Sequence, residues 1–411
     1  MTLGQLGLPQ PSLGGLVAAL GTKLSRVALH QRFTASAVAF LHRCLRFVLR
    51  QRLARVPRLQ PLALRSFRRV LIADSSSWDV SAKLRQVLPG SGGGASEANC
   101  KIQVLYDYTA GALAFLDVTP GILPDNRYTD RLPARLGPED LLLVDQGYFK
   151  LTTWQAIAAR GAFFLTRFIV HTTLRAADTG AVLDLKTLLR RHPTQAQEFR
   201  VLLGPAPAGT SACRLLCLPA SEQLANERRR RLRKEAAKKG RTVSQLHLEL
   251  CAWTLLVTNL PADRLAADQA LALYALRWQI ELLFKQLKST LRVHQSDTGK
   301  EPRLRCELYG KLILAVLLHR LHAAATLGLW QTTRHEISLA KFYKRVQERA
   351  FLILTLLQDR RAVALAYLTT ELKRLLPHCL KATQRTRLTT LETLDTAPAG
   401  PAELAATVTL T

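Results

Sequence analysis

One segment of the chain carries four polar side chains whose types and spacing could act on a phosphodiester: Tyr274, Arg277, Glu281 and Lys288. On a helix, at about 100° per residue, these four and Lys285 fall within an arc of about 80°. A carboxylate flanked by cations and a phenol is what metal-dependent chemistry on a nucleic acid backbone requires. The alternative is a solvated ladder of ion pairs, because Arg277, Glu281 and Lys285 follow one another at intervals of four.

The same segment predicts the helix that must position these groups. Its apolar residues recur at helical spacing on a separate face, which is typical of a helix packed against a sheet. They are Leu273, Leu276, Ile280, Leu283, Phe284, Leu287 and Leu291. We therefore expect a single helix over residues 273–291, with the charged stripe bordering the buried one.

Two short apolar runs end in an acid, which predicts buried strands that present carboxylates. Residues 70–73 precede Asp74, and residues 141–144 precede Asp145. Strands buried on both faces belong in the middle of an α/β sheet, and ligands collect beyond the carboxyl ends of such strands. Joined by Glu281, the two aspartates would form a cluster whose repulsion favours a divalent ion. Hard oxygen ligands select Mg²⁺ or Mn²⁺.

The pattern alone does not choose among the aspartates. Asp107 and Asp117 also follow apolar stretches, and for each of the four the commoner fate is a carboxylate exposed to water at a strand end or turn.

Further elements follow from periodicity and from turn residues. The expected elements are a small helical region over 1–65, a polar turn at 75–77, a hairpin of strands at 101–108 and 112–118, a helix at 151–160, strands at 162–169 and 248–260, less regular chain at 170–247, and helices at 308–324 and 337–358.

The charge of the chain indicates a polyanionic partner. Fifty-eight Lys and Arg against 30 Asp and Glu leave a net charge of +28, and residues 227–241 account for +7 of it. Nucleic acid is the first candidate. Acidic membrane is the competitor, but no window of eighteen uninterrupted apolar residues is present. Seven scattered cysteines without a CxxC pair predict no disulfide framework, so we expect a reduced, cytoplasmic protein.

The spacing Tyr274-x2-Arg277-x3-Glu281-x6-Lys288 resembles the Tyr-Arg-Glu-Lys signature of bacterial insertion-sequence transposases with a DDE active site. LIADSSSWD and LLLVDQGYF resemble the stretches that carry the first and second catalytic aspartates of that family. FLTRF, with Arg167, and LLVTNL resemble further family stretches, and the likeness covers about residues 68–330.

This resemblance implies an RNase H-like mixed sheet flanked by helices, with a β-rich insertion between the second Asp and the Glu. The 136 residues that separate Asp145 from Glu281 leave room for such an insertion. The implied organisation is an N-terminal helical region for binding DNA ends (1–65), the first part of the core (66–169), the insertion (170–260), the second part of the core with the Glu helix (261–330) and a C-terminal helical region that could dimerise (331–411).

The resemblance also implies the activity: cut-and-paste DNA transposition with nicking and strand transfer at the element ends. Asp74, Asp145 and Glu281 would bind two Mg²⁺ or Mn²⁺ ions, and the freed 3′-OH would attack target DNA. A homodimer would join both terminal inverted repeats, with no role for a membrane. The implied DNA contacts are Tyr274, Arg277, Lys285, Lys288, Arg167 and Trp253.

Of these contacts, Trp253 would stack on a displaced base, and its alternative is a strand aromatic packed in a core. Two competing functions stay open for the whole chain. One is an endonuclease on the same fold that does not join strands, and the other is a basic nucleic-acid-binding protein without catalysis.

Overall fold

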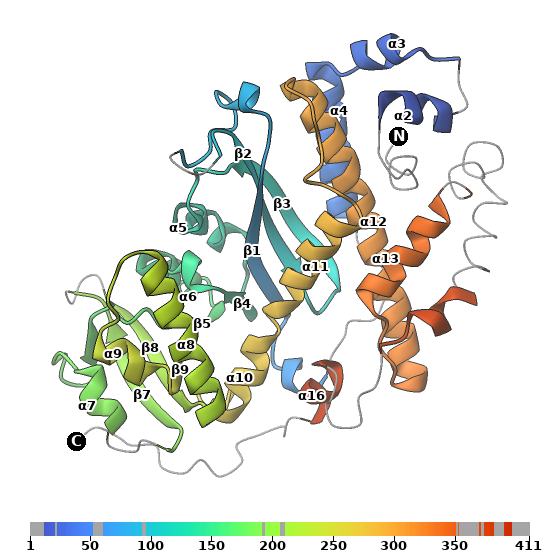
Figure 1. Cartoon of the computed structure of the whole chain (residues 1–411). Coiled ribbons are helices and arrows are strands. Elements are labelled where there is room, and N and C mark those ends of the chain that lie inside the picture. Colours follow the sequence, from blue (N-terminus) through green and yellow to red (C-terminus); the bar gives the residue numbers. More distant parts are fainter. Residues whose placement is uncertain are drawn as a thin grey trace. The chain divides into compact units, whose positions relative to one another are not determined.

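The computed structural model divides the chain into two compact units (Figure 1). Unit 1 comprises Met1–Leu59, Ala73–Leu123 and Trp278–Leu391, and unit 2 comprises Gln60–Ile72, Pro124–Arg277 and Glu392–Thr411. The structure describes residues 12–20, 23–51, 61–92, 96–190, 194–205, 210–350, 352, 370, 374–381 and 390–396.

The fold is mixed α/β, with helices and a nine-stranded sheet. The order of the strands in the sheet is β3 (Ala112–Pro120), β2 (Asn99–Asp107), β1 (Arg69–Asp79), β4 (Asp140–Val144), β5 (Phe163–Arg167), β9 (Trp253–Thr258), β8 (Ser211–Pro219), β7 (Gln197–Leu203) and β6 (Leu174–Ala176). The pairing of β4 with β5 is parallel. The pairs β2–β3, β5–β9, β8–β9, β7–β8 and β6–β7 are antiparallel. The α/β class expected from the sequence is therefore confirmed.

Strand β1 (Arg69–Asp79) corrects one local prediction. The polar turn expected at residues 75–77 is wrong, because the strand continues through these serines to Asp79. Trp78 is buried near its end, and the Asn99 amide donates to Asp79 at 2.9 Å from the neighbouring β2. Sheet pairing thus overrides the turn preference of three successive serines. Asp74 consequently lies within the strand and not beyond its end.

The hairpin of β2 (Asn99–Asp107) and β3 (Ala112–Pro120) in unit 1 is confirmed. Its turn needs Gly111, which has a φ of 57° and whose added Cβ would overlap the Cβ of Ala323 on helix α12 (Glu301–Thr333). The hairpin and α12 therefore pack closely against each other.

Long helices complete unit 1. The N-terminal region forms α2 (Leu13–Leu20), α3 (Arg26–Gln31) and α4 (Ala35–Arg50), and the C-terminal part forms α11 (Trp278–Ser289), α12 (Glu301–Thr333) and α13 (Leu339–Glu348). Helix α4 lies along α12 (Figure 1), where His42 stacks on Tyr309 and Arg320 donates to the Leu49 carbonyl at 3.1 Å.

Helix α12 is the one described helix long and apolar enough to cross a membrane by length and composition, and half of its most apolar window is buried. It contains the helix expected at 308–324, and α13 accounts for the first part of the helix expected at 337–358. The rest of that prediction, and much of the proposed region 331–411, lies outside the described residues.

Unit 2 contains three successive elements that the sequence predicted. Strand β4 (Asp140–Val144) is fully buried, α6 (Leu151–Ala158) follows it, and β5 (Phe163–Arg167) returns parallel to β4. A continuously apolar strand of this kind suits a position inside the sheet.

The remainder of unit 2 is more regular than the sequence suggested. It contains β6 (Leu174–Ala176), α7 (Leu185–Arg190), β7 (Gln197–Leu203), β8 (Ser211–Pro219), α8 (Glu222–Lys238), α9 (Gln245–Leu250), β9 (Trp253–Thr258) and α10 (Ala267–Ala275). The Arg-rich run is the helix α8, capped by the Ser221 hydroxyl. The strand expected over 248–260 is shorter, because α9 occupies its first residues.

The prediction of a single helix over 273–291 is also wrong, because two helices cover this range. Helix α10 ends at Ala275, α11 begins at Trp278, and the turn between them is closed by bonds from Leu276 to Leu273 and from Arg277 to Tyr274. These bonds reach back three residues and not four, which tightens the turn. The expected apolar face is confirmed, since each of its seven residues is at most 7% exposed. The boundary between the two units falls in the break.

Candidate active site

Strand β4 delivers Asp145 in unit 2. The strand ends at Val144, which is fully buried, whereas Asp145 is partly exposed and begins the short helix η5 (Gln146–Tyr148). Its backbone carbonyl accepts from the Tyr148 amide at 3.1 Å. The backbone is thus satisfied by the turn, while the side chain stands at the carboxyl end of a buried parallel strand, where ligands collect in such sheets.

Tyr274 ties α10 to this strand end. Its hydroxyl donates to the Val144 carbonyl at 3.4 Å and accepts from the Arg277 guanidinium. Burial, followed by the charge of Asp145, raises the pKa of Tyr274 to about 12, against the opposing charges of Arg277 and Arg167. Unit 2 therefore brings together four residues from widely separated positions: Asp145, Tyr274, Arg277 and Arg167.

Arg228 is a further cation close to Arg167, and it was not identified as a site residue from the sequence. Sequence reasoning counted it within a basic run, but its guanidinium is half-buried and donates to the Trp253 carbonyl at 3.0 Å and the Thr254 hydroxyl at 2.9 Å. Burial, and then the charge of Arg167, lowers the pKa of Arg228. Trp253 is 9% exposed at the first position of β9, so its side chain is largely packed in the unit.

Unit 1 joins Lys288 to the strand that carries Asp74. The Lys288 ammonium donates to the Ser77 carbonyl at 3.0 Å, three residues beyond Asp74 on β1. One oxygen of the Asp74 carboxylate accepts from the Ser75 amide at 2.8 Å, which holds the side chain against its own strand. Burial lowers the pKa of Lys288.

Glu281 lies in the first turn of α11, two turns before Lys288 on the same helix. Its side chain is partly exposed, whereas Lys285 is exposed. Beyond α11 the chain turns back sharply, and the buried Lys311 ammonium donates to the carbonyls of Arg292 at 2.8 Å and Gln295 at 2.9 Å. Burial lowers the pKa of Lys311 to about 8. This lysine therefore fixes the turn that follows the Lys288 end of α11.

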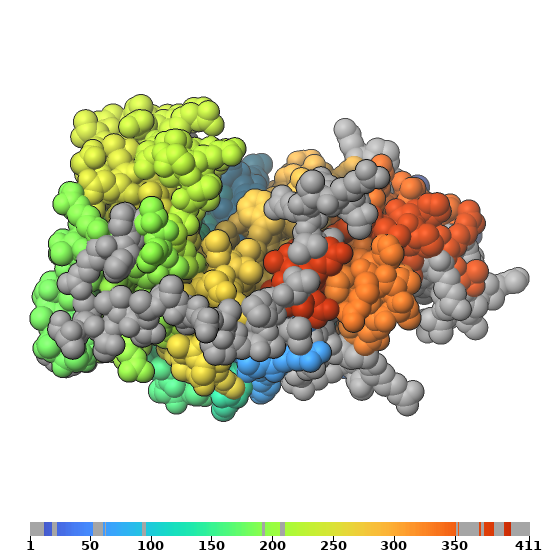
Figure 2. All heavy atoms as spheres, turned by 90° about the horizontal axis from the view of Figure 1, so that it is seen from below, coloured from blue at the N-terminus to red at the C-terminus, as the bar shows by residue number. Residues whose placement is uncertain are grey.

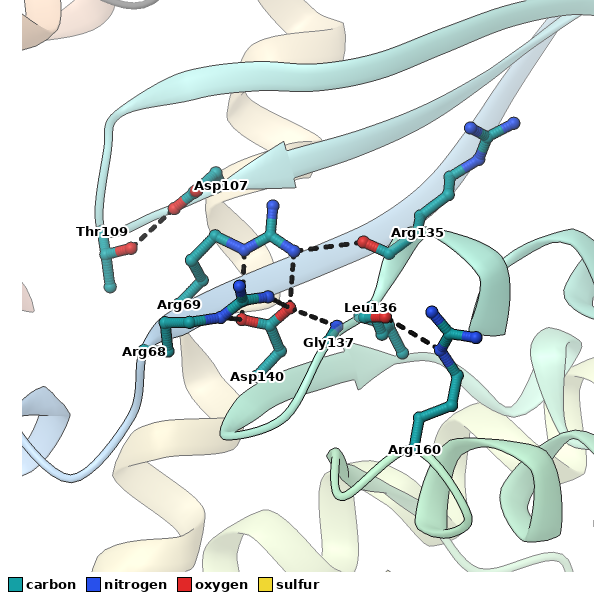
Figure 3. Close-up of polar contacts among 9 residues, drawn as sticks. All are labelled: Arg68, Arg69, Asp107, Thr109, Arg135, Leu136, Gly137, Asp140 and Arg160. Atoms are coloured by element: carbon teal, nitrogen blue, oxygen red, sulfur yellow. Dashed lines mark hydrogen bonds and ion pairs between the residues drawn. The ribbon is translucent and has the colours of Figure 1, made fainter. Parts of the chain in front are cut away.

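A buried ion-pair network at the start of β4 was not predicted (Figure 3). Asp140 is fully buried, and its carboxylate accepts from Arg68 Nε at 2.9 Å, Arg69 Nε at 3.0 Å and the Gly137 amide at 2.8 Å. These contacts pin the beginning of β1 to the beginning of β4. In the sequence, the apolar run after Asp140 predicted a functional acid only at its carboxyl end, at Asp145.

The two competing aspartates have structural roles in the hairpin. Asp107 is buried and accepts from the Thr109 hydroxyl at 2.6 Å and the Ala110 amide at 3.0 Å, so it caps the β2–β3 turn. Asp117 lies within β3 and accepts from the Val118 amide at 2.9 Å. The geometry of Asp107 accounts for its position without any ligand.

The proposed metal ligands are divided between the units: Asp74 and Glu281 belong to unit 1, and Asp145 belongs to unit 2. Within the part of the chain that the structure describes, no three His, Cys, Asp or Glu side chains form a group that could hold a metal ion. The donor chemistry fits Mg²⁺ or Mn²⁺, because all three side chains are carboxylates. Each is partly exposed, as a ligand that an ion reaches from solvent must be.

By its fold the chain is a mixed α/β protein, and the predicted acids and cations are distributed over both units. Residues 65–317 match the family model described as the transposase DDE domain. The chain therefore belongs to the DDE transposase family.

The curated relatives are transposases of insertion sequences. The chain is 29% identical over 362 residues to the transposase for insertion sequence element IS231B of Bacillus thuringiensis subsp. berliner, covering 84% of this chain and 75% of that protein. It is 26% identical over 336 residues to the transposase for IS1151 of Clostridium perfringens, covering 78% and 71%.

Among solved structures, a piggyBac transposase synaptic complex with hairpin DNA matches with a TM-score of 0.41 and 11% identity. The match covers 77% of this chain and 59% of that one.

Proposed function

We propose that this protein catalyses cut-and-paste transposition of an insertion sequence, by nicking DNA at the element ends and joining the freed 3′ ends to target DNA. The main support is the placement of the signature residues. In unit 2, Tyr274 contacts the last carbonyl of β4, directly before Asp145. In unit 1, Lys288 contacts the strand that carries Asp74. In each unit, a signature residue therefore contacts the strand that carries or precedes a predicted catalytic aspartate.

In this proposal Asp74, Asp145 and Glu281 hold two Mg²⁺ or Mn²⁺ ions. Two ions of this kind supply a clamp on the attacking and leaving oxygens of an in-line displacement. Arg277, with Arg167 beside it, neutralises the phosphate next to the scissile bond, because a planar guanidinium matches phosphate oxygens.

Three further side chains orient the DNA in this proposal. The Tyr274 hydroxyl stays protonated at neutral pH, since its pKa is raised to about 12, and it can donate to a phosphate oxygen. Lys285 and Lys288 bind further phosphates, and Trp253 stacks on a displaced base if its packing opens.

The finer organisation belongs to the same proposal. We infer an RNase H-like core (66–169 and 261–330) interrupted by the insertion (170–260), which contributes β6, β7, β8 and β9 to the sheet. The helical region 1–65 would bind the terminal repeats, and residues 331–411 would support a homodimer that joins both element ends. The protein would act in the bacterial cytoplasm on double-stranded DNA.

Excision of a repeat-flanked donor tests the reaction. The full-length protein should excise the donor only with Mg²⁺ or Mn²⁺, and excess chelator should abolish excision and nicking. Asp145→Asn keeps the size of the side chain but removes the charge, and should lose excision while retaining its thermal unfolding midpoint. Nicking by the wild type that persists in chelator would contradict the proposal.

Strand transfer with precut end DNA separates the proposal from its competitors. A transposase joins such ends to a target plasmid, whereas an endonuclease on the same fold nicks DNA and leaves the ends unjoined. A binding protein without catalysis does neither and binds DNA equally well as Asp74→Ala.

Tyr274→Phe should lower excision about 10-fold, since a hydrogen bond to a charged partner contributes about 1.5–3 kcal/mol. The free energy of unfolding should change little, because the ring stays buried and the bond to Val144 is long at 3.4 Å. Tyr343→Phe is the matched control: this buried tyrosine also donates to a backbone carbonyl at 3.4 Å, that of Ala315, and should leave excision unchanged. If Tyr274→Phe excises the donor at the wild-type rate, the Tyr274 hydroxyl has no role in the reaction.

A further inference from the structure

Helix α8 has two faces with different roles. Its inner face carries Ala225, which is fully buried, and the partly buried Leu232. The first two arginines of the Arg-rich run serve this face. Arg228 bonds to the start of β9, and Arg229 bonds to Glu222, Asn226 and the Leu248 carbonyl. These two cations are used within the protein.

The outer face carries cations that the fold does not use. At about 100° per residue, Arg230, Lys234 and Lys238 lie within about 40° of the direction opposite Ala225. They are all exposed, and successive members rise by about 6 Å along the helix. Within the described part of the chain, no carboxylate forms an ion pair with any of the three. They form a straight row, which we call the outer ridge.

The surroundings of the outer ridge are also basic. Arg231, Arg233 and Lys239 are exposed beside it, against the exposed Glu235, and one exposed anion, Glu227, lies on the same face before Arg230. In Figure 2 the yellow-green side chains of this part of the chain stand at the molecular surface. Like charges at intervals of four destabilise a helix by a few tenths of a kcal/mol, so stability alone does not favour the ridge.

The inner face connects the helix to the candidate site. Arg228 is close enough to Arg167 for that charge to lower its pKa, and Arg167 also acts on Tyr274. All of these residues belong to unit 2. The outer ridge therefore lies in the same unit as Asp145, on the face of α8 opposite the one that contacts β9.

We propose that the outer ridge of α8 binds the phosphate backbone of duplex DNA, independently of base sequence. The inference rests on the proposed function and adds the surface that holds the DNA. Evenly spaced cations on a rigid helix match a duplex, whose charge repeats along its axis. Contacts with phosphate fix position and orientation and carry no sequence information.

The test compares two triple variants of the full-length protein by fluorescence anisotropy on a mixed-sequence duplex. Arg230→Gln/Lys234→Gln/Lys238→Gln removes the outer ridge. Arg127→Gln/Arg190→Gln/Lys344→Gln removes three exposed cations elsewhere and matches the loss of charge. Thermal unfolding checks that both variants fold.

The ridge variant should bind about 10-fold or more weakly, with the slope of log affinity against log salt reduced by about 2–3. The control should keep its affinity within about twofold and its slope within about 1. Equal losses in both variants, or an unchanged ridge variant, would overturn the inference and leave the proposed function standing. A wild type that binds no duplex even in low salt would overturn both.

Discussion

Glu281→Gln is expected to reduce excision of a repeat-flanked donor about 1000-fold while leaving duplex binding intact. The change keeps the shape of the side chain and removes one of three proposed ligand charges. Metal stabilisation of the transferring phosphoryl contributes several kcal/mol, and each 1.4 kcal/mol corresponds to about tenfold in rate. Single-turnover nicking on a labelled element end measures the effect without the later steps.

The stability of the variant and a control substitution distinguish a chemical role of Glu281 from a structural one. Glu281 is partly exposed in the first turn of α11, beside a buried face that the substitution leaves untouched. The unfolding midpoint should therefore remain that of the wild type. Glu97→Gln makes the same chemical change at an exposed position of unit 1 outside the proposed site and should excise normally. A Glu281→Gln protein that excises at the wild-type rate would remove Glu281 from the proposed ligands.

The second large effect is expected on stability, at Asp140. Asp140→Asn should lower the free energy of unfolding by about 3 kcal/mol, because removing one partner of a buried ion pair leaves the other charges uncompensated. The value lies at the lower end for such changes, since the Arg68 side chain is 47% exposed and can regain water. Urea denaturation of the full-length protein measures it.

The same network predicts a loss of stability in acid. Burial opposes ionisation of Asp140, but hydrogen bonds from Arg69, Arg68 and Gly137 outweigh it and hold the pKa of the carboxyl below its usual range. Because the folded pKa is the lower one, this stabilisation is complete above the unfolded pKa of about 3.9 and is lost as pH falls through the folded pKa. The difference between wild type and Asp140→Asn should therefore narrow below about pH 4.

Asp130 is the matched control for this prediction. Its pKa is also lowered, first by the hydrogen bond from Lys150, but the pair is exposed. Exposed ion pairs contribute little to stability. The free energy of unfolding of Asp130→Asn should therefore be close to that of the wild type. If Asp130→Asn lost as much free energy of unfolding as Asp140→Asn, burial of the ion pair would not explain the effect at Asp140.

Much of the local structure could be predicted from short stretches of sequence. Strand β4 and the apolar face of α11 follow from runs and periods of apolar residues, because burial of such residues drives both elements. The position of Asp145 at the end of β4 followed from the same run. The signature from Tyr274 to Lys288 indicated the family, and the family match confirms it.

Contacts between distant residues could not be predicted in the same way. Arg68 and Asp140 are 72 residues apart, and the residues around each of them do not indicate that the two form an ion pair. The turn at Leu276 and Arg277 could not be predicted either, because it contains no Gly or Pro. Backbone hydrogen bonds that reach back three residues and those that reach back four occur with the same residue types. In α8 the sequence shows one run of arginines, and only the packing distinguishes Arg228, which is bound to β9, from Arg230, which faces solvent.

The sequence by itself determined the family and the buried strands, because these depend on residue type and near spacing. Only the tertiary structure decided which groups meet: Tyr274 with the end of β4, and Lys288 with β1. It also assigned Asp107 to a turn. The physical reason is that burial patterns are local, whereas hydrogen bonds and ion pairs depend on how distant segments pack together.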